Sequence, residues 1–406
     1  MPKKLNILMA TEAFYPDGIG GAHTYVYNLS KYLIRQGHRV YVITIKNGES
    51  ALADEDIEGI KVLRYKTPIS GLFLFVRRPI CSIINSRRLF CSIAKEVKFD
   101  VINFHLALPA FGLSTCSFSK GIPKIYTFHS SMAGDVAVQV KKKKYFPSFL
   151  NSLVFAVIRS IEKADLKWCD KVIVLSGFSK RCLTEIYKQD PGKITIIPGG
   201  VDVNKFIPVI DKMLLRKELS IPADKTVLLT ARRLVARMGL ENLIYAMRHV
   251  IEKEKNVILL ILGEGFLREK LELIITQNGL KDYVILLGPV DAGKMSSYYQ
   301  ACDAFVLPTE QDEWFGLVTI EALSCGIPVL GTPVGGTSEI LGSIDKALLF
   351  SGTGARDMAK GILDFLGNKD RFTGKSREFR KFAEDNYSWE IVSRKTEDIY
   401  LSILGK

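Results

Sequence analysis

The sequence has no long hydrophobic run, and this argues against a membrane-spanning helix. The uncharged stretch 101–119 is interrupted by Pro109 and by polar side chains. The apolar run near the N-terminus ends at Glu12 after about seven residues, which is at the lower limit for the core of a signal peptide. A first β-strand explains that run better. We therefore expect a cytoplasmic protein that is at most peripheral on the inner face of the membrane.

Cysteine is sparse, and its spacing does not suggest a metal or redox centre. The seven cysteines are odd in number and include no C-x-x-C pair. This pattern is typical of reduced, mostly buried thiols in a cytosolic protein. No D-x-D motif stands at the end of an expected strand. We therefore expect neither a bound metal nor a cofactor.

Acidic residues are in deficit in one half of the chain. Residues 1–200 hold 29 Lys+Arg against 15 Asp+Glu, whereas residues 201–406 hold 27 against 28. The first half is therefore expected to face an anionic partner. Basic and apolar residues mix in 72–90 and 141–163, which favours association with an anionic membrane surface. The alternative is a solvated charged face over core helices. Nucleic acid is not expected, because aromatic stacking platforms are not apparent.

The length of 406 residues predicts two domains. Strands, helices and glycine turns alternate, and the strands are continuous Val/Ile/Leu runs that are typical of parallel strands covered on both faces. We predict an α/β protein of two doubly wound, Rossmann-like domains that face a central cleft. The expected strands are 5–11, 38–45, 171–176, 193–198, 226–231, 256–263, 283–289, 304–308 and 328–332.

A glycine- and proline-rich stretch at 198–211 indicates a hinge between the halves. We expect an N-terminal domain at 1–203 and a C-terminal domain at 204–385. The helical segment at about 386–406 is expected to pack back on the first domain.

Two glutamates flank the start of an expected helix. Between Trp314 and Ser338 the only charged residue is Glu321, eight positions after Glu313. The helix is expected to begin near Gly316, where free N–H groups and a partial charge of roughly +0.5 suit a diphosphate. Glu321 needs hydrogen-bond donors on an apolar helix, and sugar or ribose hydroxyls would supply them. Alternatively, Glu313 is a helix-terminal charge and Glu321 pairs with a buried arginine.

A series of motifs now identifies a family resemblance. EWFGLVTIE is an E-x(7)-E motif, and FYPDGIGGAHTYVYNL, TFH, VIVLSGFSK, PGGVD, RRLVARMG, LLILGEG and ACDAFVLPTE occur in the expected order. This set resembles the retaining glycosyltransferases of family 4, also called group 1, over nearly the whole chain. The resemblance implies the GT-B fold and a metal-independent retaining hexosyltransferase, with 1–203 as the acceptor domain and 204–385 as the donor domain. It would move a sugar from a UDP- or GDP-type nucleotide sugar to a glycan or lipid-linked acceptor.

The resemblance also assigns roles to residues. It implies that Glu313 holds donor-sugar hydroxyls, that Arg233 neutralises the departing diphosphate and that His129 lies near the donor sugar. Glu321 would bind the ribose, and backbone groups near Gly263 and Val290 are expected to contact the base. The complete donor-binding set is Gly20, Gly21, Arg237, Phe315, Gly316, Leu317, Val318, Glu321, Gly263 and Val290.

Three histidines are further candidates for the site, and two of them have an alternative structural role. His129 is either an active-site group or a core histidine beneath the loop. His105 stands at a strand end in DVINFH and is expected on the acceptor side. His23 opens the first helix, either on the acceptor side or only as a helix-start residue.

One departure from the family pattern bears on activity. The lysine of R-L-x-x-x-K-G is Met238 here, and a thioether cannot bind phosphate electrostatically. Either Arg232 or Arg237 supplies the charge, or Arg233 and the helix amides suffice. If no other group replaces the lysine, the stabilisation of the leaving group would fall by roughly 1.5–3 kcal/mol.

The alternative function is a catalytically silent homologue that acts as a scaffold or partner subunit. A nicotinamide-dependent dehydrogenase does not fit, because GIGGAH lacks the G-x-G-x-x-G spacing.

Overall fold

The computed structural model describes residues 4–16, 20–47, 52–71, 74–134 and 148–405, with the backbone alone at 75 and 148–152. The basic run at 141–144 therefore lies outside the described residues. Internal contacts divide the chain into two compact units. Unit 1 is Met1–Pro198 with Val392–Lys406, and unit 2 is Gly199–Ile391.

Unit 1 is built on an eight-stranded sheet in the order β3-β4-β2-β1-β5-β6-β7-β8. All neighbouring strands are parallel except β3 and β4. The strands are β1 (Asn6–Ala10), β2 (Arg39–Ile45), β3 (Asp54–Ile57), β4 (Ile60–Tyr65), β5 (Val101–Phe104), β6 (Lys124–Phe128), β7 (Lys171–Val174) and β8 (Ile194–Ile196). The helices are α1 (Gly21–Arg35), α2 (Leu74–Ile93), α3 (Ala107–Ser114), α5 (Ser148–Trp168), α6 (Gly177–Glu185) and, from Val392, α16 (Trp389–Ile403), with short 3₁₀ turns η1 (Ser117–Ser119) and η2 (Pro191–Lys193).

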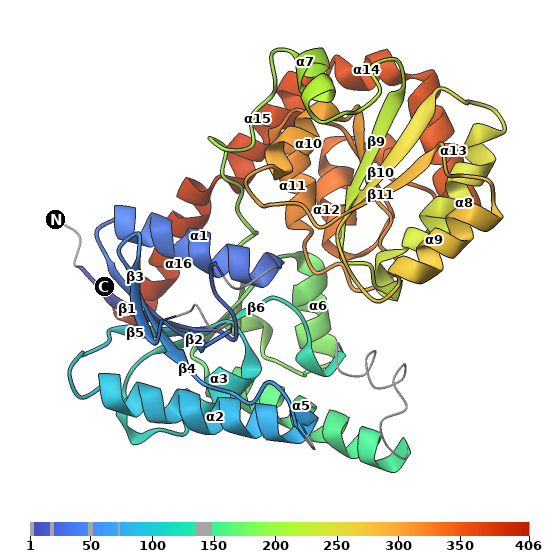
Figure 1. The fold of residues 1–406 in the computed structure, drawn as a ribbon. Coiled ribbons are helices and arrows are strands. Elements are labelled where there is room, and N and C mark those ends of the chain that lie inside the picture. Colours follow the sequence, from blue (N-terminus) through green and yellow to red (C-terminus); the bar gives the residue numbers. More distant parts are fainter. Residues whose placement is uncertain (1–3, 17–19, 48–51, 72–73, 135–147, 406) are drawn as a thin grey trace. The chain divides into compact units, whose positions relative to one another are not determined.

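Helices cover both faces of this sheet, which explains why its central strands read as continuous apolar runs. Figure 1 shows α1 and α16 on one face and α2, α3 and α5 on the other. The last helix is tied to unit 1 by polar contacts. Asn103 Nδ2 donates to the Tyr400 hydroxyl at 2.7 Å, and His38 Nε2 lies 2.9 Å from Glu397 Oε1.

Unit 2 is built on a five-stranded parallel sheet in the order β11-β10-β9-β12-β13. Its strands are β9 (Thr226–Ala231), β10 (Val257–Leu262), β11 (Val284–Gly288), β12 (Ala304–Leu307) and β13 (Val329–Gly331). Its helices are α7 (Lys212–Glu218), α8 (Leu240–Ile251), α9 (Arg268–Gln277), α10 (Met295–Ala301), α11 (Leu317–Ser324), α12 (Gly335–Ile344), α13 (Ala355–Gly367), α14 (Lys369–Thr373) and α15 (Ser376–Tyr387), with η3 (Ala236–Met238) and η4 (Lys346–Leu348).

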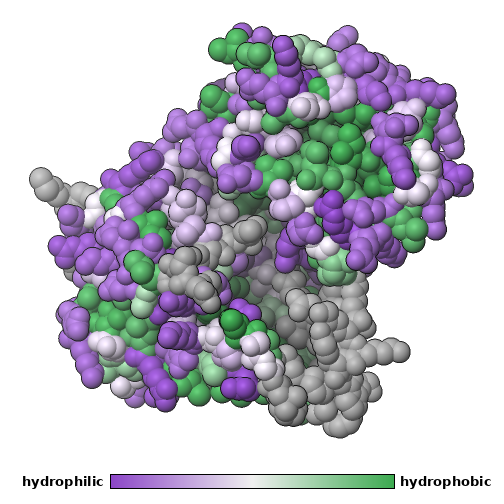
Figure 2. All heavy atoms as spheres, viewed as in Figure 1, coloured by the Kyte–Doolittle hydropathy of each residue, from purple (hydrophilic) through white to green (hydrophobic). Residues whose placement is uncertain are grey.

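The helices of unit 2 also pack in two layers around the sheet. Figure 1 shows α8, α9 and α13 on one side and α7, α10, α11 and α15 on the other. The edge strand β11 is less covered, because Ile285 and Leu287 are exposed. Figure 2 shows hydrophobic residues gathered over β9, β10 and β11. Both units confirm the predicted GT-B class of two parallel-sheet α/β domains.

Each sheet has a point at which the strand order reverses. In unit 1 the chain runs outward from β1 to β2 and β4 on one side and from β5 to β8 on the other. In unit 2 it runs from β9 to β11 on one side and from β12 to β13 on the other. Ligands of doubly wound sheets bind outside the carboxyl ends of the strands at such a point. The loops after β1, β5, β9 and β12 are therefore the first places to look for a site.

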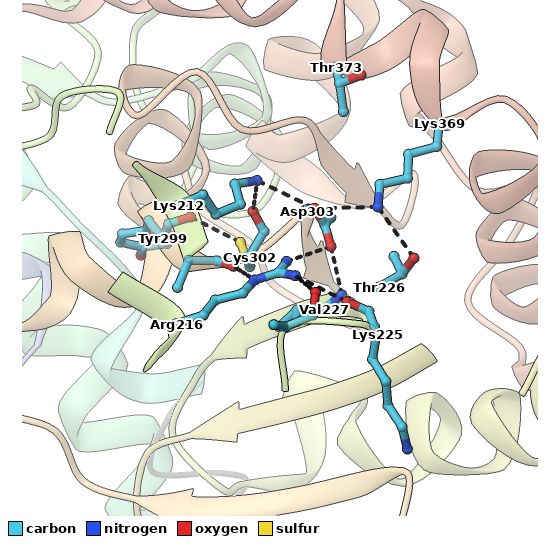
Figure 3. Close-up of polar contacts among 12 residues, drawn as sticks. Lys212, Arg216, Lys225, Thr226, Val227, Tyr299, Cys302, Asp303, Lys369 and Thr373 are labelled. Atoms are coloured by element: carbon cyan, nitrogen blue, oxygen red, sulfur yellow. Dashed lines mark hydrogen bonds and ion pairs between the residues drawn. The ribbon is translucent and has the colours of Figure 1, made fainter. Parts of the chain in front are cut away.

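A buried ionic cluster holds the amino end of β12 in unit 2, as Figure 3 shows. Asp303 Oδ2 accepts from Arg216 Nη2 at 2.7 Å and from the Val227 amide at 2.8 Å. Its Oδ1 lies 3.4 Å from Lys212 Nζ and 3.5 Å from Lys369 Nζ. Burial opposes ionisation of Asp303, but Lys212 and the Val227 amide outweigh it and hold its pKa below the usual value. The cluster joins α7 and α14 to the sheet.

The structure corrects one expectation about cysteine. Cys91 of α2 and Cys116, just after α3, form a disulfide, so the prediction that all seven thiols are reduced is wrong for this pair. The reason is tertiary, because α2 packs along α3 and brings together two positions that the chain separates by 25 residues. The other five cysteines are free.

The described residues contain no helix with both the length and the hydropathy to cross a bilayer.

Candidate functional site

In unit 2 the two loops at the strand-order reversal are joined directly. Residues 232–239 follow β9, and residues 308–316 follow β12. The amide of Glu310 donates to the Arg237 carbonyl at 2.9 Å, and Arg237 Nη1 donates to the Asp312 carbonyl at 3.0 Å. A Cβ on Gly239 would lie 1.8 Å from the Pro308 carbonyl oxygen, so only glycine permits this approach.

Glu313 lies at the centre of this junction, and its carboxylate is paired. Oε2 accepts from Arg232 Nη2 and, at 2.8 Å, from the Thr309 hydroxyl. Arg232 Nη2 also donates to the Thr309 hydroxyl at 2.9 Å. The side chains of Arg232 and Glu313 are only 8% and 9% exposed. The simple helix-terminal charge considered for Glu313 therefore does not describe it, since its direct partner is an arginine.

Two glycines at the start of α12 contact the backbone of Glu313. The amide of Gly336 donates to the Glu313 carbonyl at 2.7 Å. Gly335 has φ 57°, and a Cβ there would lie 2.0 Å from the same carbonyl oxygen. The start of α12 thus fixes the backbone of Glu313, and any larger residue at 335 would displace it.

The start of α11 offers unused hydrogen-bond donors. Gly316 is its N-cap with φ 90°, and α11 begins at Leu317, as predicted for this helix. The backbone N–H groups of Phe315, Gly316, Leu317 and Val318 donate to no group among the described residues. A chain of free amides at a helix N-terminus is an anion-binding arrangement.

Two threonine hydroxyls border the same place. Thr319 Oγ1 and Thr337 Oγ1 would lie 3.1 Å and 3.2 Å from a Cβ on Gly316. Both hydroxyls are buried, and neither has a partner within the described part of the chain. Buried hydroxyls normally find a partner, so these two favour a polar ligand beside Gly316. Neither threonine was predicted from the sequence as a site residue.

Glu321 lies on α11 and has a tyrosine partner rather than the arginine that was considered. The Tyr299 hydroxyl donates to its Oε2 at 2.8 Å. Burial raises the pKa of Glu321, and the bond from Tyr299 opposes that shift. Its assignment as the ribose-binding acid stays a prediction.

The structure distinguishes the positive groups near the loop after β9. Arg233 is exposed, whereas Met238 is buried within η3. Arg237 is committed to the backbone of Asp312. Arg232 is the cation that reaches the carboxylate of Glu313.

The residues expected to contact the base follow β10 and β11. The amide of Gly263 donates to the Gly288 carbonyl at 2.8 Å, and Val290 is half-buried two residues later. A Cβ on Gly263 would lie 1.9 Å from the Arg232 carbonyl oxygen. Gly263 is therefore required for packing against Arg232, whatever it contacts in a ligand.

In unit 1 the glycine loop after β1 leads into α1. Gly20 is the N-cap of α1 with φ 141°, and Gly21 is its first residue. His23 lies in the first turn of α1, where its Nδ1 would be 3.8 Å from a Cβ on Gly20. Residues 17–19 of the GIGG loop lie outside the described residues.

His105 and His129 follow the neighbouring strands β5 and β6 and form a pair. Nδ1 of His105 and Nε2 of His129 share a hydrogen bond at 3.0 Å, and the rings stack with centroids 5.3 Å apart. The Tyr25 ring meets His129 edge-on at 4.9 Å. Burial lowers the pKa of His105, with His129 adding to the shift. Burial, with His23 adding to it, lowers the pKa of His129 to about 3, so both rings are neutral at pH 7.

His105 keeps one unsatisfied atom that a neutral ligand would fit. Its Nε2 is buried and has no partner among the residues that the structure describes. A neutral imidazole pair can donate or accept a hydrogen bond but cannot act as a fixed cation. The pair lies at the carboxyl edge of its sheet, next to the strand-order reversal. The acceptor-side role of His105 and the active-site role of His129 remain predictions.

No group of three or more His, Cys, Asp or Glu side chains that could hold a metal ion occurs in the described ranges.

Comparison with known proteins shows which families the sequence matches. Residues 19–205 match the family described as "Glycosyltransferase Family 4", and residues 211–385 match the one described as "Glycosyl transferases group 1". A D-inositol 3-phosphate glycosyltransferase from Xylanimonas cellulosilytica is 25% identical over 94% of this chain and 91% of its own.

Solved structures show the same architecture. A sucrose-phosphate synthase from Thermosynechococcus elongatus superposes with a TM-score of 0.82 at 23% identity, over 99% of this chain and 100% of the other. HepE of Anabaena, in complex with UDP and glucose, superposes with a TM-score of 0.74 at 19% identity, over 98% and 100%. At these identities the structures establish the fold.

Proposed function

The chain belongs to the group 1 glycosyltransferases with the GT-B fold, and we propose from this premise that it transfers a hexose from a UDP- or GDP-sugar with retention of anomeric configuration. The observation that carries the proposal is the start of α11. Free amides of Phe315, Gly316, Leu317 and Val318 lie beside Glu313, whose carboxyl carbon would be 3.7 Å from a Cβ on Gly316. Amides suit a diphosphate and a carboxylate suits sugar hydroxyls.

The proposed mechanism depends on stabilising the departing nucleotide diphosphate. The amides at the start of α11, together with Arg233, would offset the charge that develops there. A phosphate oxygen of the leaving group would take the proton of the acceptor hydroxyl, and the acceptor oxygen would attack from the face that the leaving group vacates. We propose no metal in this step, since the amides and arginines would carry the charge. Neutral His129 would donate or accept a hydrogen bond at the sugar.

A nucleotide-sugar screen tests this function. UDP, GDP and ADP are expected to raise the melting temperature by different amounts, because the gain in stability grows with the ratio of ligand concentration to Kd. A nucleotide at a hundredfold excess over its Kd adds about 2.7 kcal/mol to the free energy of unfolding. Sugars of the stabilising nucleotide should then be hydrolysed, with EDTA leaving the rate unchanged. A nucleotide that stabilises the protein without any turnover would support the alternative, a silent homologue that acts as a scaffold or partner. Absence of both effects would refute nucleotide-sugar binding.

The acceptor is proposed to be a glycan or a lipid-linked molecule, and unit 1 supports a peripheral membrane location. The arginines of α2 are all exposed, and α2 contains no acidic residue. The two acids of α5, Glu162 and Asp165, are buried at 1% and 0% exposure. Between α2 and α3 lies an open groove of about 580 Å³, bordered by Arg87, Arg88 and Phe111.

Vesicle binding tests this location. The protein is expected to sediment with vesicles that contain about a third anionic lipid and not with neutral vesicles, and salt should release it. Replacing Arg87 and Arg88 by Gln should weaken binding about 30-fold, at about 1 kcal/mol for each charge. The matched control replaces the exposed Lys360 and Lys381 of unit 2 by Gln. Equal loss in both variants, or equal binding to neutral vesicles, would contradict the proposal.

A further inference from the structure

Arg232 and Glu313 each keep one polar group open toward a ligand. Arg232 uses Nη2 for both of its contacts, and in the described residues its Nη1 donates to nothing. Glu313 uses Oε2 for both of its contacts, so Oε1 accepts from no described group. The pair therefore presents one hydrogen-bond donor beside one acceptor. Its two charges cancel, although both side chains are more than nine-tenths buried.

We propose that Arg232 determines specificity for the donor sugar. With Glu313 it binds one hydroxyl of a neutral sugar ring in both directions: Arg232 Nη1 donates to the hydroxyl oxygen, and Glu313 Oε1 accepts the hydroxyl hydrogen. The inference rests on the proposed function and deepens it, since it names the chemical class of the sugar. The donor sugar is uncharged and keeps a free hydroxyl at the position that faces the pair.

The position of Arg232 is fixed by its backbone. Its amide donates to the Leu262 carbonyl at 2.9 Å, and Gly263 packs so closely that a Cβ would reach the Arg232 carbonyl oxygen. The side chain is held by Thr309 and Glu313, and its Nε is buried without a partner in the described part of the chain. Arg237, which was considered with Arg232 as a replacement for the family lysine, is tied to the Asp312 carbonyl. Arg232 is therefore the guanidinium that a sugar at Glu313 would meet.

The opposite charges of Arg232 and Glu313 favour a hydroxyl over other substituents of the sugar. A sugar carboxylate would be attracted by Arg232 but repelled by Glu313. A deoxy position would leave one buried donor and one buried acceptor unsatisfied, at about 1–3 kcal/mol for each. A hydroxyl satisfies both, because it donates one hydrogen and accepts at its oxygen. Sites built to bind a substrate hydroxyl reject the analogue that lacks it by about 10⁴-fold or more.

The test compares donor analogues in the full-length protein. The probe is UDP-glucose or GDP-mannose, whichever is hydrolysed faster, together with its series of monodeoxy and monofluoro analogues. For wild type, kcat/KM should fall at least about 10³-fold at one ring position, for the deoxy and the fluoro analogue alike, since fluorine donates no hydrogen. In Arg232→Met this ratio should shrink to about 10-fold or less, because one of the two partners is gone.

Two further measurements distinguish a role of Arg232 at the sugar from a loss of folding. Arg232→Lys retains the charge beside Glu313 but loses the planar fork, and it should give an intermediate ratio. UDP or GDP alone should still raise the melting temperature of both variants, which shows that they fold and that Arg232 acts on the sugar.

Several results would overturn the inference. Loss of nucleotide stabilisation in both variants would assign Arg232 to the phosphates. An unchanged analogue ratio in Arg232→Met, with an active wild type, would overturn the inference alone. Absence of turnover by wild type would overturn the inference together with the proposed function.

Discussion

Glu313→Ala is expected to reduce sugar transfer by at least about 10³-fold. The carboxylate adjoins the free amides at the start of α11, and it is directed by two hydrogen bonds at Oε2. Its loss removes the acceptor for a sugar hydroxyl and releases Arg232, so the sugar would no longer be held against the leaving group. The measurement is the initial rate of transfer or donor hydrolysis with the donor found by screening.

This variant must also be checked for folding, because the ion pair is buried. Removing one member of such a pair leaves an uncompensated charge, at about 3–5 kcal/mol. Glu313→Gln keeps the shape and one acceptor oxygen for Arg232, so it should destabilise the protein less than Glu313→Ala while losing most activity, although Arg232 loses its counter-charge. Far-UV circular dichroism and the nucleotide-induced shift in melting temperature report on folding separately from the rate.

A matched control lies three residues earlier in the same loop. Glu310 accepts from Asn242 Nδ2 at 2.9 Å, and within the described residues its side chain has no hydrogen bond or ion pair with Arg232 or Glu313. Glu310→Ala should therefore retain activity within a few-fold of wild type. Full activity in Glu313→Ala, or an equal loss in Glu310→Ala, would contradict the role given to Glu313.

Much of the fold could be predicted because parallel strands covered on both faces have a distinctive composition. The run 257–262 consists entirely of Val, Ile and Leu and forms β10, and the run 226–231 has Val and two Leu at its centre and forms β9. The start of α11 was readable from Gly316, since its N-cap conformation with φ 90° favours glycine. The β3–β4 hairpin was missed, because the strand sequence DEDI is polar and lies at the sheet edge.

The sequence predicted individual site residues but not which of them lie close together. Glu313 and Arg232 are 81 positions apart, and they meet because β12 inserts beside β9 where the strand order reverses. Local composition does not determine that order. His105 was predicted at a strand end, and His129 was predicted either in the active site or in the core beneath the loop. Their hydrogen bond depends on β5 and β6 being neighbours, which neither prediction contains. Thr319 and Thr337 carry no sequence signal, because threonine is common on ordinary buried helix faces.

Asp303→Ala is expected to lower the free energy of unfolding by about 3–5 kcal/mol, a loss as large as the one expected for removing Glu313 from its buried pair. Asp303 is the shared anion for Arg216, Lys212 and Lys369, and Arg216 is only 2% exposed. Without the carboxylate, the guanidinium keeps its carbonyl partners but loses its counter-charge, and the Val227 amide loses its acceptor.

The measurement is the urea midpoint followed by tryptophan fluorescence, and an exposed ion pair of the same unit provides the control. Asp385 lies 3.1 Å from Lys381 on α15, with both side chains more than half exposed. Asp385→Ala should cost only about 0.3–0.5 kcal/mol, because water screens the pair and the flexible side chains lose entropy when ordered. A comparable loss in the two variants would mean that the Asp303 cluster is not a buried anchor. A loss confined to Asp303→Ala would show that the buried cluster stabilises the amino end of β12, the strand that leads to the Glu313 loop.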